Sequence, residues 1–209
     1  MNKQIYLVRH GESDGNALGV VQGPDTELSK EGLHQAERIG QRLSNLNFNL
    51  LLSSPFHRAE QTAQIISKNT GKEIEYSDLF IERRRPSAML GLKQSSSEYI
   101  SLHERYTQAF ADGEEYEDGE SFAAIAARAK KALRFLDERE EEKIVVVTHG
   151  MFLRMLCSFV ILGDVLDAKT CTKFIQTLKT RNTGISIFNK SEKGWRLEAW
   201  NDHAHFAEY

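Results

Sequence analysis

The chain has 209 residues and a formal net charge of −3, with 40% hydrophobic and 27% charged residues. These values are typical of a globular protein of one-domain size and give no sign of nucleic-acid binding. The longest apolar stretch, residues 151–162, is too short to span a bilayer, and residues 1–4 contain no apolar leader core. We therefore expect a cytoplasmic protein without nucleic-acid or membrane partners.

The sequence contains two cysteines, Cys157 inside the apolar stretch and Cys171 ahead of an expected strand. Two isolated thiols in such surroundings are typical of small core residues and not of a disulfide framework or a zinc site. We predict that both thiols are buried or half-buried and unreactive.

The first expected element is a buried strand over residues 5–8, which is followed directly by Arg9, His10 and Gly11. In open α/β sheets, ligands bind outside the carboxyl ends of the strands. An arginine and a histidine at that place can hold and attack an anion, and phosphate is the first candidate. The alternative is a solvated arginine beside a histidine that only caps a turn.

Helices and strands are expected to alternate between residues 29 and 76. The expected elements are a helix over 29–46, a strand over 50–53, a helix over 56–67 and a short strand over 73–76. Ser29 is the expected N-cap of the first helix, whose apolar face includes Leu33. Ser54 and Pro55 have the pattern of an N-cap and a first helical position, which places Arg58 in the first turn of the second helix.

Residues 77–119 interrupt this alternation. They contain Arg83-Arg84-Arg85-Pro86, a serine-rich patch at 95–97 and an acidic loop at 112–119. We expect this region to form a modest cap over the carboxyl edge of the sheet, where loops that set specificity usually lie.

The rest of the chain predicts two further helices and three strands. They are a long helix capped by Ser121, a buried strand over 144–147, a buried helix over 150–162, and strands over 184–189 and 195–200 joined by a turn at 191–194. Strand 144–147 is followed by Thr148, His149 and Gly150, which repeats the strand, histidine and glycine order of the first segment. The expected fold class is α/β, with a mainly parallel sheet, helices on both faces and an antiparallel terminal hairpin.

Candidate site residues thus follow three of the expected strands. Arg9 and His10 follow the strand over 5–8, Arg58 follows the strand over 50–53, and His149 follows the strand over 144–147. If these strands are parallel neighbours, the four side chains face one crevice. Further segments then complete a recognisable pattern: residues 9–16, 22–23, 28–36, 53–63, 119–121, 147–150 and 182–186. In these segments the chain resembles the histidine phosphatase superfamily, in the branch that contains cofactor-dependent phosphoglycerate mutases and broad-specificity phosphatases.

The resemblance implies one phosphoglycerate mutase-like domain over residues 1–209 and a role for each matching residue. His10 is the expected nucleophile, which passes through a phosphohistidine, and Glu82 is the expected proton donor. The residues expected to form the phosphate pocket are Arg9, Arg58 and His149. The residues expected to line the substrate site are Asn16, Gln22, Gly23 and Gly150.

The residues after Glu82 separate two activities within the family. The mutases have a histidine, a tyrosine and glycines after this glutamate and then a longer insertion, whereas this chain has Arg83-Arg84-Arg85-Pro86. That difference favours a phosphatase acting on a small phosphorylated metabolite. The alternatives are mutase-type phosphoryl transfer, a phosphoprotein phosphatase and a non-catalytic phosphate binder. The sequence leaves the oligomeric state open, including a homodimer.

Arginines and histidines can supply the electrostatic stabilisation that a metal supplies in other phosphoryl-transfer enzymes. None of the expected strand ends carries the aspartate pair of a magnesium site. We therefore expect no metal ion and no cofactor.

Some residues near the expected site have competing explanations. Glu82 could form a salt bridge with residues 83–85, and Glu73 or Glu75 could act in its place. Glu12 and Asp14 could orient His10, and Glu12 could instead bond backbone groups of the turn. The remaining histidines are expected at surface, tail or helix positions: His34, His57, His103, His203 and His205.

The three consecutive arginines 83–85 also allow two interpretations. In the first, one or two of them reach the substrate and select a second anionic group, while the others meet the acidic loop or solvent. In the second, they form a salt-bridged surface patch that contributes little.

Overall fold

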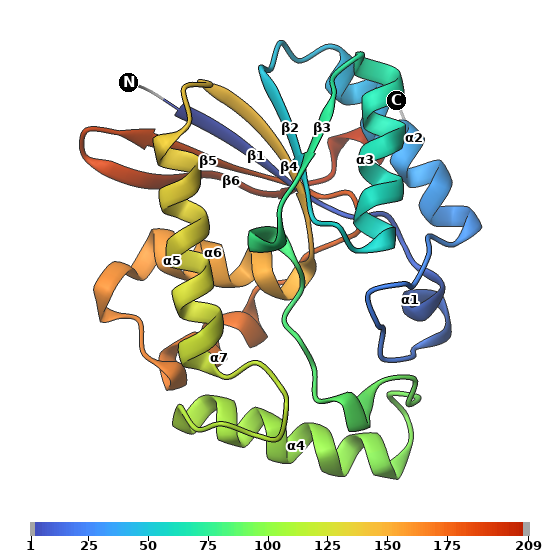
Figure 1. Cartoon of the computed structure of the whole chain (residues 1–209), viewed down its shortest axis with the longest axis vertical. Coiled ribbons are helices and arrows are strands. Elements are labelled where there is room, and N and C mark those ends of the chain that lie inside the picture. Colours follow the sequence, from blue (N-terminus) through green and yellow to red (C-terminus); the bar gives the residue numbers. More distant parts are fainter. Residues whose placement is uncertain (1–2, 207–209) are drawn as a thin grey trace.

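The computed structural model describes residues 3–206, and its centre is a six-stranded sheet in the order β3-β2-β4-β1-β5-β6 (Figure 1). The strands are β1 Lys3–Arg9, β2 Leu50–Ser53, β3 Ile74–Tyr76, β4 Lys143–Thr148, β5 Ile185–Ser191 and β6 Gly194–Asp202. The first four strands are parallel, and β5 and β6 are antiparallel additions at one edge. The predicted α/β fold with a terminal hairpin is confirmed.

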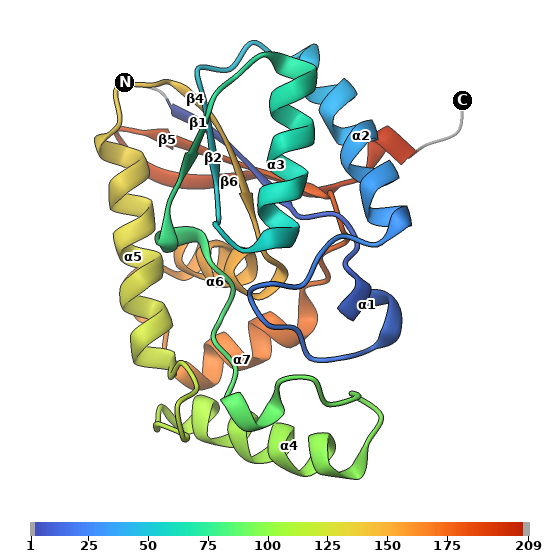
Figure 2. The same ribbon diagram turned by 45° about the vertical axis from the view of Figure 1, so that its right-hand side comes forward.

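The seven α-helices of the described residues lie on both faces of the sheet and beyond its carboxyl edge. They are α1 Asp14–Leu18, α2 Lys30–Ser44, α3 His57–Thr70, α4 Ser97–Asp112, α5 Phe122–Glu138, α6 Gly150–Leu162 and α7 Ala168–Thr177. Helices α2 and α3 cover one face, and α5 and α6 cover the other (Figures 1 and 2). Helix α4 packs against α7, away from the sheet. Short 3-10 turns span Asp78–Phe80, Ser87–Met89, Gly163–Val165 and Ala204–Phe206.

Strand β4 shows why an unbroken apolar run was needed at the centre of the sheet. Ile144 and Val146 pack into the core with α5 and α6, whereas Val145 and Val147 pack into the core with α2 and α3. All four side chains are fully buried. A strand covered on both faces has no position for a polar side chain.

The strand register brings the predicted strand ends together. Arg9 pairs with Thr148 between β1 and β4, and Ser53 pairs with Val147 between β2 and β4. The residues that follow these three strands therefore meet at one edge of the sheet.

Two helix details were predicted wrongly. The N-cap of α3 is Phe56 and not Ser54, whose hydroxyl accepts the N–H of Phe56 at 3.3 Å. Leu33 is 43% exposed and does not belong to the buried face of α2. On that face, Gly32 lies against the backbone of Glu12 in the loop after β1. A Cβ atom on Gly32 would lie 1.8 Å from the carbonyl oxygen of Glu12, so only glycine fits there.

Three helices were not predicted: α1, α4 and α7. Cys171 lies within α7 and does not precede a strand. Both cysteines are free and buried, as predicted, and burial raises the pKa of Cys157 to about 12 and that of Cys171 to about 11. Among the described helices, none combines the length and the apolar character needed to cross a bilayer.

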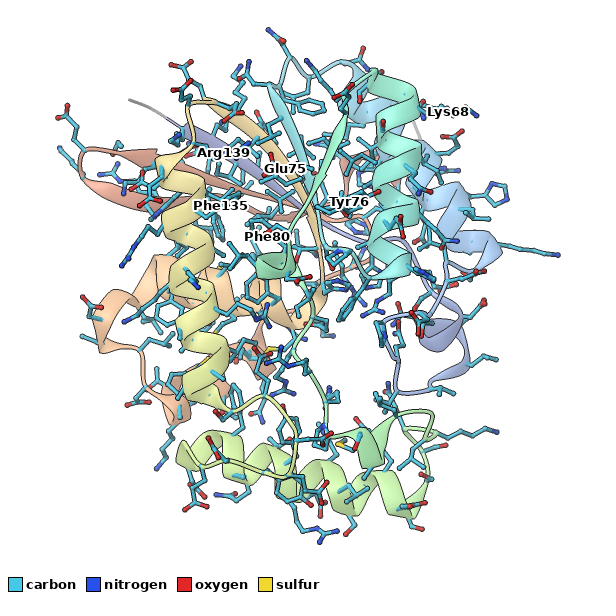
Figure 3. The ribbon with its side chains drawn as sticks, viewed as in Figure 1. Lys68, Glu75, Tyr76, Phe80, Phe135 and Arg139 are labelled. Atoms are coloured by element: carbon cyan, nitrogen blue, oxygen red, sulfur yellow. The ribbon has the colours of Figure 1, made fainter. Side chains whose placement is uncertain are left out.

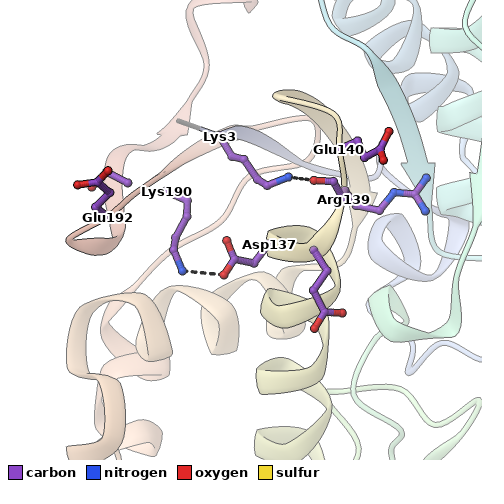
Figure 4. A pocket seen from close by; sticks show the side chains of 8 residues that line it. Lys3, Asp137, Arg139, Glu140, Lys190 and Glu192 are labelled. Carbon is purple, nitrogen blue, oxygen red and sulfur yellow. Dashed lines mark hydrogen bonds and ion pairs between the residues drawn. The ribbon is translucent and has the colours of Figure 1, made fainter. Parts of the chain in front are cut away.

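A surface hollow at the amino ends of the parallel strands is lined mainly by charged residues, and several of them have polar partners (Figure 4). Lys3 Nζ donates to the carbonyl of Arg139, and Lys190 Nζ lies 2.8 Å from Asp137 Oδ2. The Arg139 guanidinium also pairs with Glu75 at 2.6 Å (Figure 3). This end of the sheet holds a salt-bridged surface, and the histidines and arginines identified above lie at the other end.

Candidate active site

His10 follows β1 directly and is 3% exposed. Its Nδ1 lies 2.6 Å from the carbonyl oxygen of Gly11. Because a carbonyl oxygen only accepts hydrogen bonds, Nδ1 carries the proton and Nε2 carries the lone pair of the neutral ring. Nε2 lies 3.2 Å from Nε of Arg58. The nitrogen able to attack phosphorus therefore lies beside a guanidinium group.

Arg58 is the second residue of α3 and reaches the end of β1. Its Nη1 donates to the carbonyl oxygen of Gly23 at 2.9 Å, while its Nε donates to His10 Nε2. Two fixed hydrogen bonds hold the planar guanidinium in one orientation. In that orientation it can bond the oxygens of a phosphoryl group that approaches Nε2.

Arg9 is held by the segment before β5. Its Nη1 donates to the carbonyl oxygen of Thr180 at 2.7 Å, and its Nε is buried without a partner among the described residues. A Cβ atom on Gly150 would lie 3.2 Å from that Nε and 3.0 Å from Oγ1 of Thr180. Gly150 thus leaves the space that Arg9 occupies.

His149 follows β4 and is fully buried beside His10, with the two ring centroids 5.0 Å apart. Its Nε2 lies 2.8 Å from Oγ of Ser54, and the ring of Phe56 packs edge-on at 5.3 Å. Ser54, which the sequence suggested as a helix cap, therefore fixes the orientation of the second histidine.

The pKa values of both histidines are lowered. Burial lowers the pKa of His10 well below 6.5, and the charges of Arg58 and Arg9 lower it further. Burial, then Arg58 and His10, lower the pKa of His149 in the same way. Both rings are therefore neutral near pH 7, and His10 keeps its lone pair. Burial lowers the pKa of Arg58 to about 10, which leaves it protonated at that pH.

Glu82 accepts three backbone hydrogen bonds, from the N–H groups of Arg83 at 2.9 Å, Met151 at 3.1 Å and Phe152 at 3.0 Å. The last two belong to the first turn of α6, where the helix dipole also favours a negative charge. Burial raises the pKa of Glu82, but the hydrogen bonds and the charges of Arg58 and Arg154 outweigh it, so the net pKa is lowered.

These backbone hydrogen bonds replace the salt bridge to residues 83–85 that the sequence left open. The competing carboxylates lie elsewhere, since Glu75 pairs with Arg139 and neither Glu73 nor Glu75 lines the cavity that contains His10.

A buried ion pair supports the segment that carries Glu82. Arg128 contacts Glu120 through two hydrogen bonds of 2.9 and 2.7 Å. Its Nη1 also donates to the carbonyl oxygens of Leu79 at 3.2 Å and Ile81 at 2.8 Å. Arg128 thereby links α5 to the backbone just before Glu82.

A cavity of about 580 Å³ joins these groups at the carboxyl edge of the sheet. Of the predicted site residues, its lining includes Arg9, His10, Asn16, Gln22, Gly23, Arg58 and Glu82. His149 and Gly150 are not part of that lining. They lie behind it, against His10 and Arg9 respectively.

Two further residues at this site were missed in the sequence. Asn182 Nδ2 donates to the carbonyl oxygen of His10 at 3.0 Å and to Oδ1 of Asn16 at 3.3 Å. Arg154 lines the cavity from α6. A single arginine within an otherwise apolar buried helix was the available signal for Arg154, whereas the role of Asn182 depends on how β5 pairs with β1.

The possibility that Glu12 or Asp14 orients His10 does not hold. Glu12 does not orient His10, because its Oε1 accepts the hydroxyl of Ser29 at 2.8 Å. Asp14 is exposed. The orienting group is the backbone carbonyl of Gly11.

Two histidines expected at the surface or the tail make specific contacts. His103 is half-buried and lines a second cavity beside the first. His205 Nε2 lies 3.1 Å from Oγ1 of Thr183, in the segment that follows Asn182.

The arginines 83–85 do not meet the acidic loop. All three line the active-site cavity, and none forms a salt bridge within the described part of the chain. Asp118 instead accepts the N–H of Ser87 at 2.9 Å, and the backbone of Arg84 bonds Glu120. A salt-bridged patch is therefore not what the three arginines form.

Across residues 3–206, no cluster of three or more His, Cys, Asp or Glu side chains has an arrangement suited to a metal ion.

Residues 5–203 match the family described as the histidine phosphatase superfamily, branch 1. The chain is 32% identical to a "Probable phosphoglycerate mutase GpmB" of Erwinia tasmaniensis, over 94% of this chain and 89% of the relative. It is 29% identical to a "Metal-independent phosphoserine phosphatase" of Arabidopsis thaliana, over 98% of this chain and 83% of the relative.

Solved structures show the same fold. A phosphoserine phosphatase mutant of Entamoeba histolytica in complex with phosphoserine aligns with a TM-score of 0.78 and 26% identity, covering 98% of this chain and 100% of that one. A mycobacterial hydrolase aligns with a TM-score of 0.80 and 23% identity, over 97% and 99% of the two chains. The predicted fold and family are confirmed.

Proposed function

Because the chain belongs to branch 1 of the histidine phosphatase superfamily, we propose that it hydrolyses phosphate monoesters of small metabolites without a metal ion, through a phosphohistidine on His10. The observation that carries this proposal is the environment of His10. Its Nδ1 is fixed by the Gly11 carbonyl, and its Nε2 lone pair faces the guanidinium of Arg58.

In the first step, the Nε–H of Arg58 moves its hydrogen bond from Nε2 of His10 to a phosphoryl oxygen. The freed Nε2 lone pair of His10 attacks phosphorus, and the bond between phosphorus and the ester oxygen breaks. Charge spreads over the phosphoryl oxygens in this transition state, so fixed cations lower the barrier. Arg58 and Arg9, whose charges both act on His10, supply that charge. Neutral His149 fills the space behind the nucleophile and adds a hydrogen-bonding nitrogen.

The leaving oxygen needs a proton, and Glu82, which lines the same cavity as His10 and Arg58, is the carboxyl group that gives it in this proposal. Its pKa is lowered in the empty site. A bound phosphate dianion offsets the charges of Arg58 and Arg154 and raises that pKa, so that proton uptake accompanies substrate binding.

In the second step, Glu82 takes a proton from water while the water oxygen attacks phosphorus. The bond between phosphorus and nitrogen then breaks, and the electron pair returns to Nε2 of His10. Inorganic phosphate then leaves, the pKa of Glu82 falls again, and the proton that Glu82 took from water is released.

Hydrolysis is favoured over mutase chemistry by the residues around Glu82. Arginines 83–85 line the cavity at the point where mutases carry a histidine, a tyrosine and glycines. The relative named as a metal-independent phosphoserine phosphatase adds support. Since another relative is named as a probable phosphoglycerate mutase, transfer between the hydroxyls of phosphoglycerate is the alternative to test.

The test measures phosphate release from sugar phosphates, phosphoglycerates, phosphoserine, nucleotides and phosphopeptides, with and without EDTA. We expect release from one or more small substrates, at rates that EDTA does not change. Loss of activity in EDTA that zinc or magnesium restores would contradict metal independence. Interconversion of phosphoglycerates without phosphate release would identify a mutase, and release from phosphopeptides alone would identify a phosphoprotein phosphatase. Substrate binding without any turnover would identify a non-catalytic phosphate binder.

A further inference from the structure

A second cavity of about 270 Å³ adjoins the active-site cavity. It lies between α4, α6 and α7 and shares four lining residues with the first cavity: Arg83, Arg85, Gln94 and Arg154. A ligand whose phosphate sits at His10 can therefore extend past these residues into the second cavity.

Three of the shared residues are arginines without a salt-bridged carboxylate among residues 3–206. Glu82 is the carboxylate whose charge acts on both Arg83 and Arg154, and the backbone N–H groups of Arg83, Met151 and Phe152 already hold it. Arginine is found buried mainly where an anion matches its planar donors. The shared wall thus has an excess of positive charge.

Each arginine is held in place by different contacts. The Arg83 guanidinium lies 4.7 Å from the ring centre of Tyr106 and 4.8 Å from that of Phe110. Its Nε is buried and has no partner among the described residues. Stacking between two rings restricts the guanidinium without using its N–H donors.

The other two guanidiniums keep donors available as well. Arg85 Nη1 lies 3.2 Å from Nδ1 of His103, which accepts because the guanidinium has no lone pair to offer. Arg154 uses Nε and Nη1 on the carbonyl oxygens of Gly150 and Ile175, each at 3.0 Å, and directs no described hydrogen bond from Nη2.

The pKa values of Arg83 and His103, which line the second cavity, are lowered by burial and by the neighbouring positive charges. Burial and the like charge of Arg85 lower the pKa of Arg83 to about 10. Burial, Arg85 and Arg83 also lower the pKa of His103 to about 4, so that this ring is neutral at pH 7 and does not add a further cation. An anion between the arginines removes their mutual repulsion.

We propose that this second cavity binds an oxyanion at the far end of the substrate, held by Arg83, Arg85 and Arg154. The inference rests on the proposed phosphatase function and names its substrate class: phosphate monoesters that carry a second carboxylate or phosphate, separated from the first by a short linker. Beside these arginines, the second cavity is lined by the apolar side chains of Phe110 and Ile175 and by the polar side chain of Gln176.

The test compares matched substrates of increasing linker length. One series is the ω-phosphorylated carboxylic acids, the second is their uncharged primary amides, and the third is the bisphosphates of the corresponding diols. At one linker length, we expect kcat/KM for the acid or the bisphosphate to exceed kcat/KM for the amide at least about tenfold. A factor of this size corresponds to one hydrogen bond with a charged group. The series that gains more identifies the second group as carboxylate or phosphate.

The selectivity ratio is then measured in Arg85→Gln and Arg83→Gln, with Arg105→Gln as the control. Arg105 is an exposed residue of α4 that lines neither cavity. We expect the ratio to fall several-fold in the first two variants and at high salt, and to stay unchanged in the control. Arg85→Gln is decisive if loss of the stacked Arg83 impairs folding.

Calorimetric binding of non-hydrolysable phosphonate analogues of the acid and amide separates failure of the subsite from failure of the phosphatase. A tighter Kd for the acid that Arg85→Gln abolishes supports the subsite even if no ester is hydrolysed. Equal Kd values, or equal kcat/KM values at every linker length while esters are hydrolysed, overturn the subsite and leave the proposed function standing.

Discussion

At the scale of single residues, the proposed chemistry depends on which nitrogen of His10 carries the proton. The Gly11 carbonyl accepts from Nδ1, and the Arg58 guanidinium donates towards Nε2. Both contacts favour the same neutral tautomer, and burial among arginines keeps the ring from protonating. A backbone carbonyl thus does what a carboxylate does in the catalytic triads of other enzymes.

Long-range proton–nitrogen NMR correlations test this assignment. We expect the His10 ring to show the Nδ1–H tautomer at pH 7 and to remain neutral as the pH falls through 6.5, because its pKa is lowered. Exposed His34 serves as the control. Protonation of His10 near pH 6.5, or an Nε2–H tautomer, would contradict the assignment.

Replacement of Glu82 by glutamine tests the proton donor. General acid catalysis matters most for a poor leaving group, so we expect a loss of about 100-fold or more on an alkyl phosphate. The loss on p-nitrophenyl phosphate should be much smaller in its first step, which a pre-steady-state burst of nitrophenol reports. Equal losses in both first steps would mean that the donor lies elsewhere.

The sequence could identify His10, Arg9, Arg58 and His149 because each follows or closely succeeds an apolar strand. It could not identify Ser54 or Asn182, because their contacts depend on the orientation of one ring and on an antiparallel strand pairing. The role of Glu12 stayed open in the sequence for the same reason, since its partner is the hydroxyl of Ser29, seventeen positions away.

At the scale of elements, helix α5 positions the segment that carries Glu82. Arg128 and Glu120 are 12% and 1% exposed, and Arg128 also holds two carbonyl groups of that segment. Removing one member of a buried pair leaves an uncompensated charge and is strongly destabilising.

We expect Arg128→Met to lower the free energy of unfolding by about 3 kcal/mol, measured by urea denaturation. Replacing Glu120 by methionine in the same chain should recover part of that loss. If Arg128 is a positioning residue, Arg128→Met also reduces turnover of alkyl phosphates more than the nitrophenol burst, and Arg128→Lys restores part of it. A loss of stability with unchanged leaving-group dependence would leave only a structural role.

Helix α6 was predicted with its observed bounds. The apolar run is too long for a typical strand, and glycines at positions 150 and 163 mark its two ends. Helix α4 was missed although Tyr99, Tyr106 and Phe110 lie on its buried side. Its N-cap, Ser96, lies within a serine-rich patch that suggests a loop, and its packing partner α7 is distant in the sequence.

At the scale of the whole molecule, a chain of net charge −3 concentrates arginines at one edge of its sheet. Composition alone conceals this distribution: six arginines line the active-site cavity, with Glu82 and Asp118 as the carboxylates of the same lining. The positive charges add to burial in lowering the pKa values of His10 and His149.

This arrangement makes stability depend on pH. The pKa values of His10, His103, His149, His203 and His205 are all lowered, to about 4 for His103 and His205. Below pH 6.5 the unfolded chain binds protons that the folded chain does not, so stability is lost as the pH falls from about 6.5 towards 4.

Urea denaturation at several pH values checks this expectation. The urea concentration at the unfolding midpoint should decrease when the pH is lowered from 7 to 5. This decrease should be smaller in His205→Asn, whereas His34→Asn, at an exposed position, should leave it unchanged. A midpoint that is constant or rises over this interval would contradict the lowered pKa values.

The central claim is tested most directly by trapping the phosphoenzyme. The protein is mixed rapidly with a ³²P-labelled phosphate monoester and quenched in alkaline denaturant, in which phosphohistidine survives. We predict a label that is stable to alkali, is released by acid and maps to the peptide containing His10, and that is absent from folded His10→Gln. Turnover by wild type without such a label, or a label that persists in His10→Gln, would contradict the account.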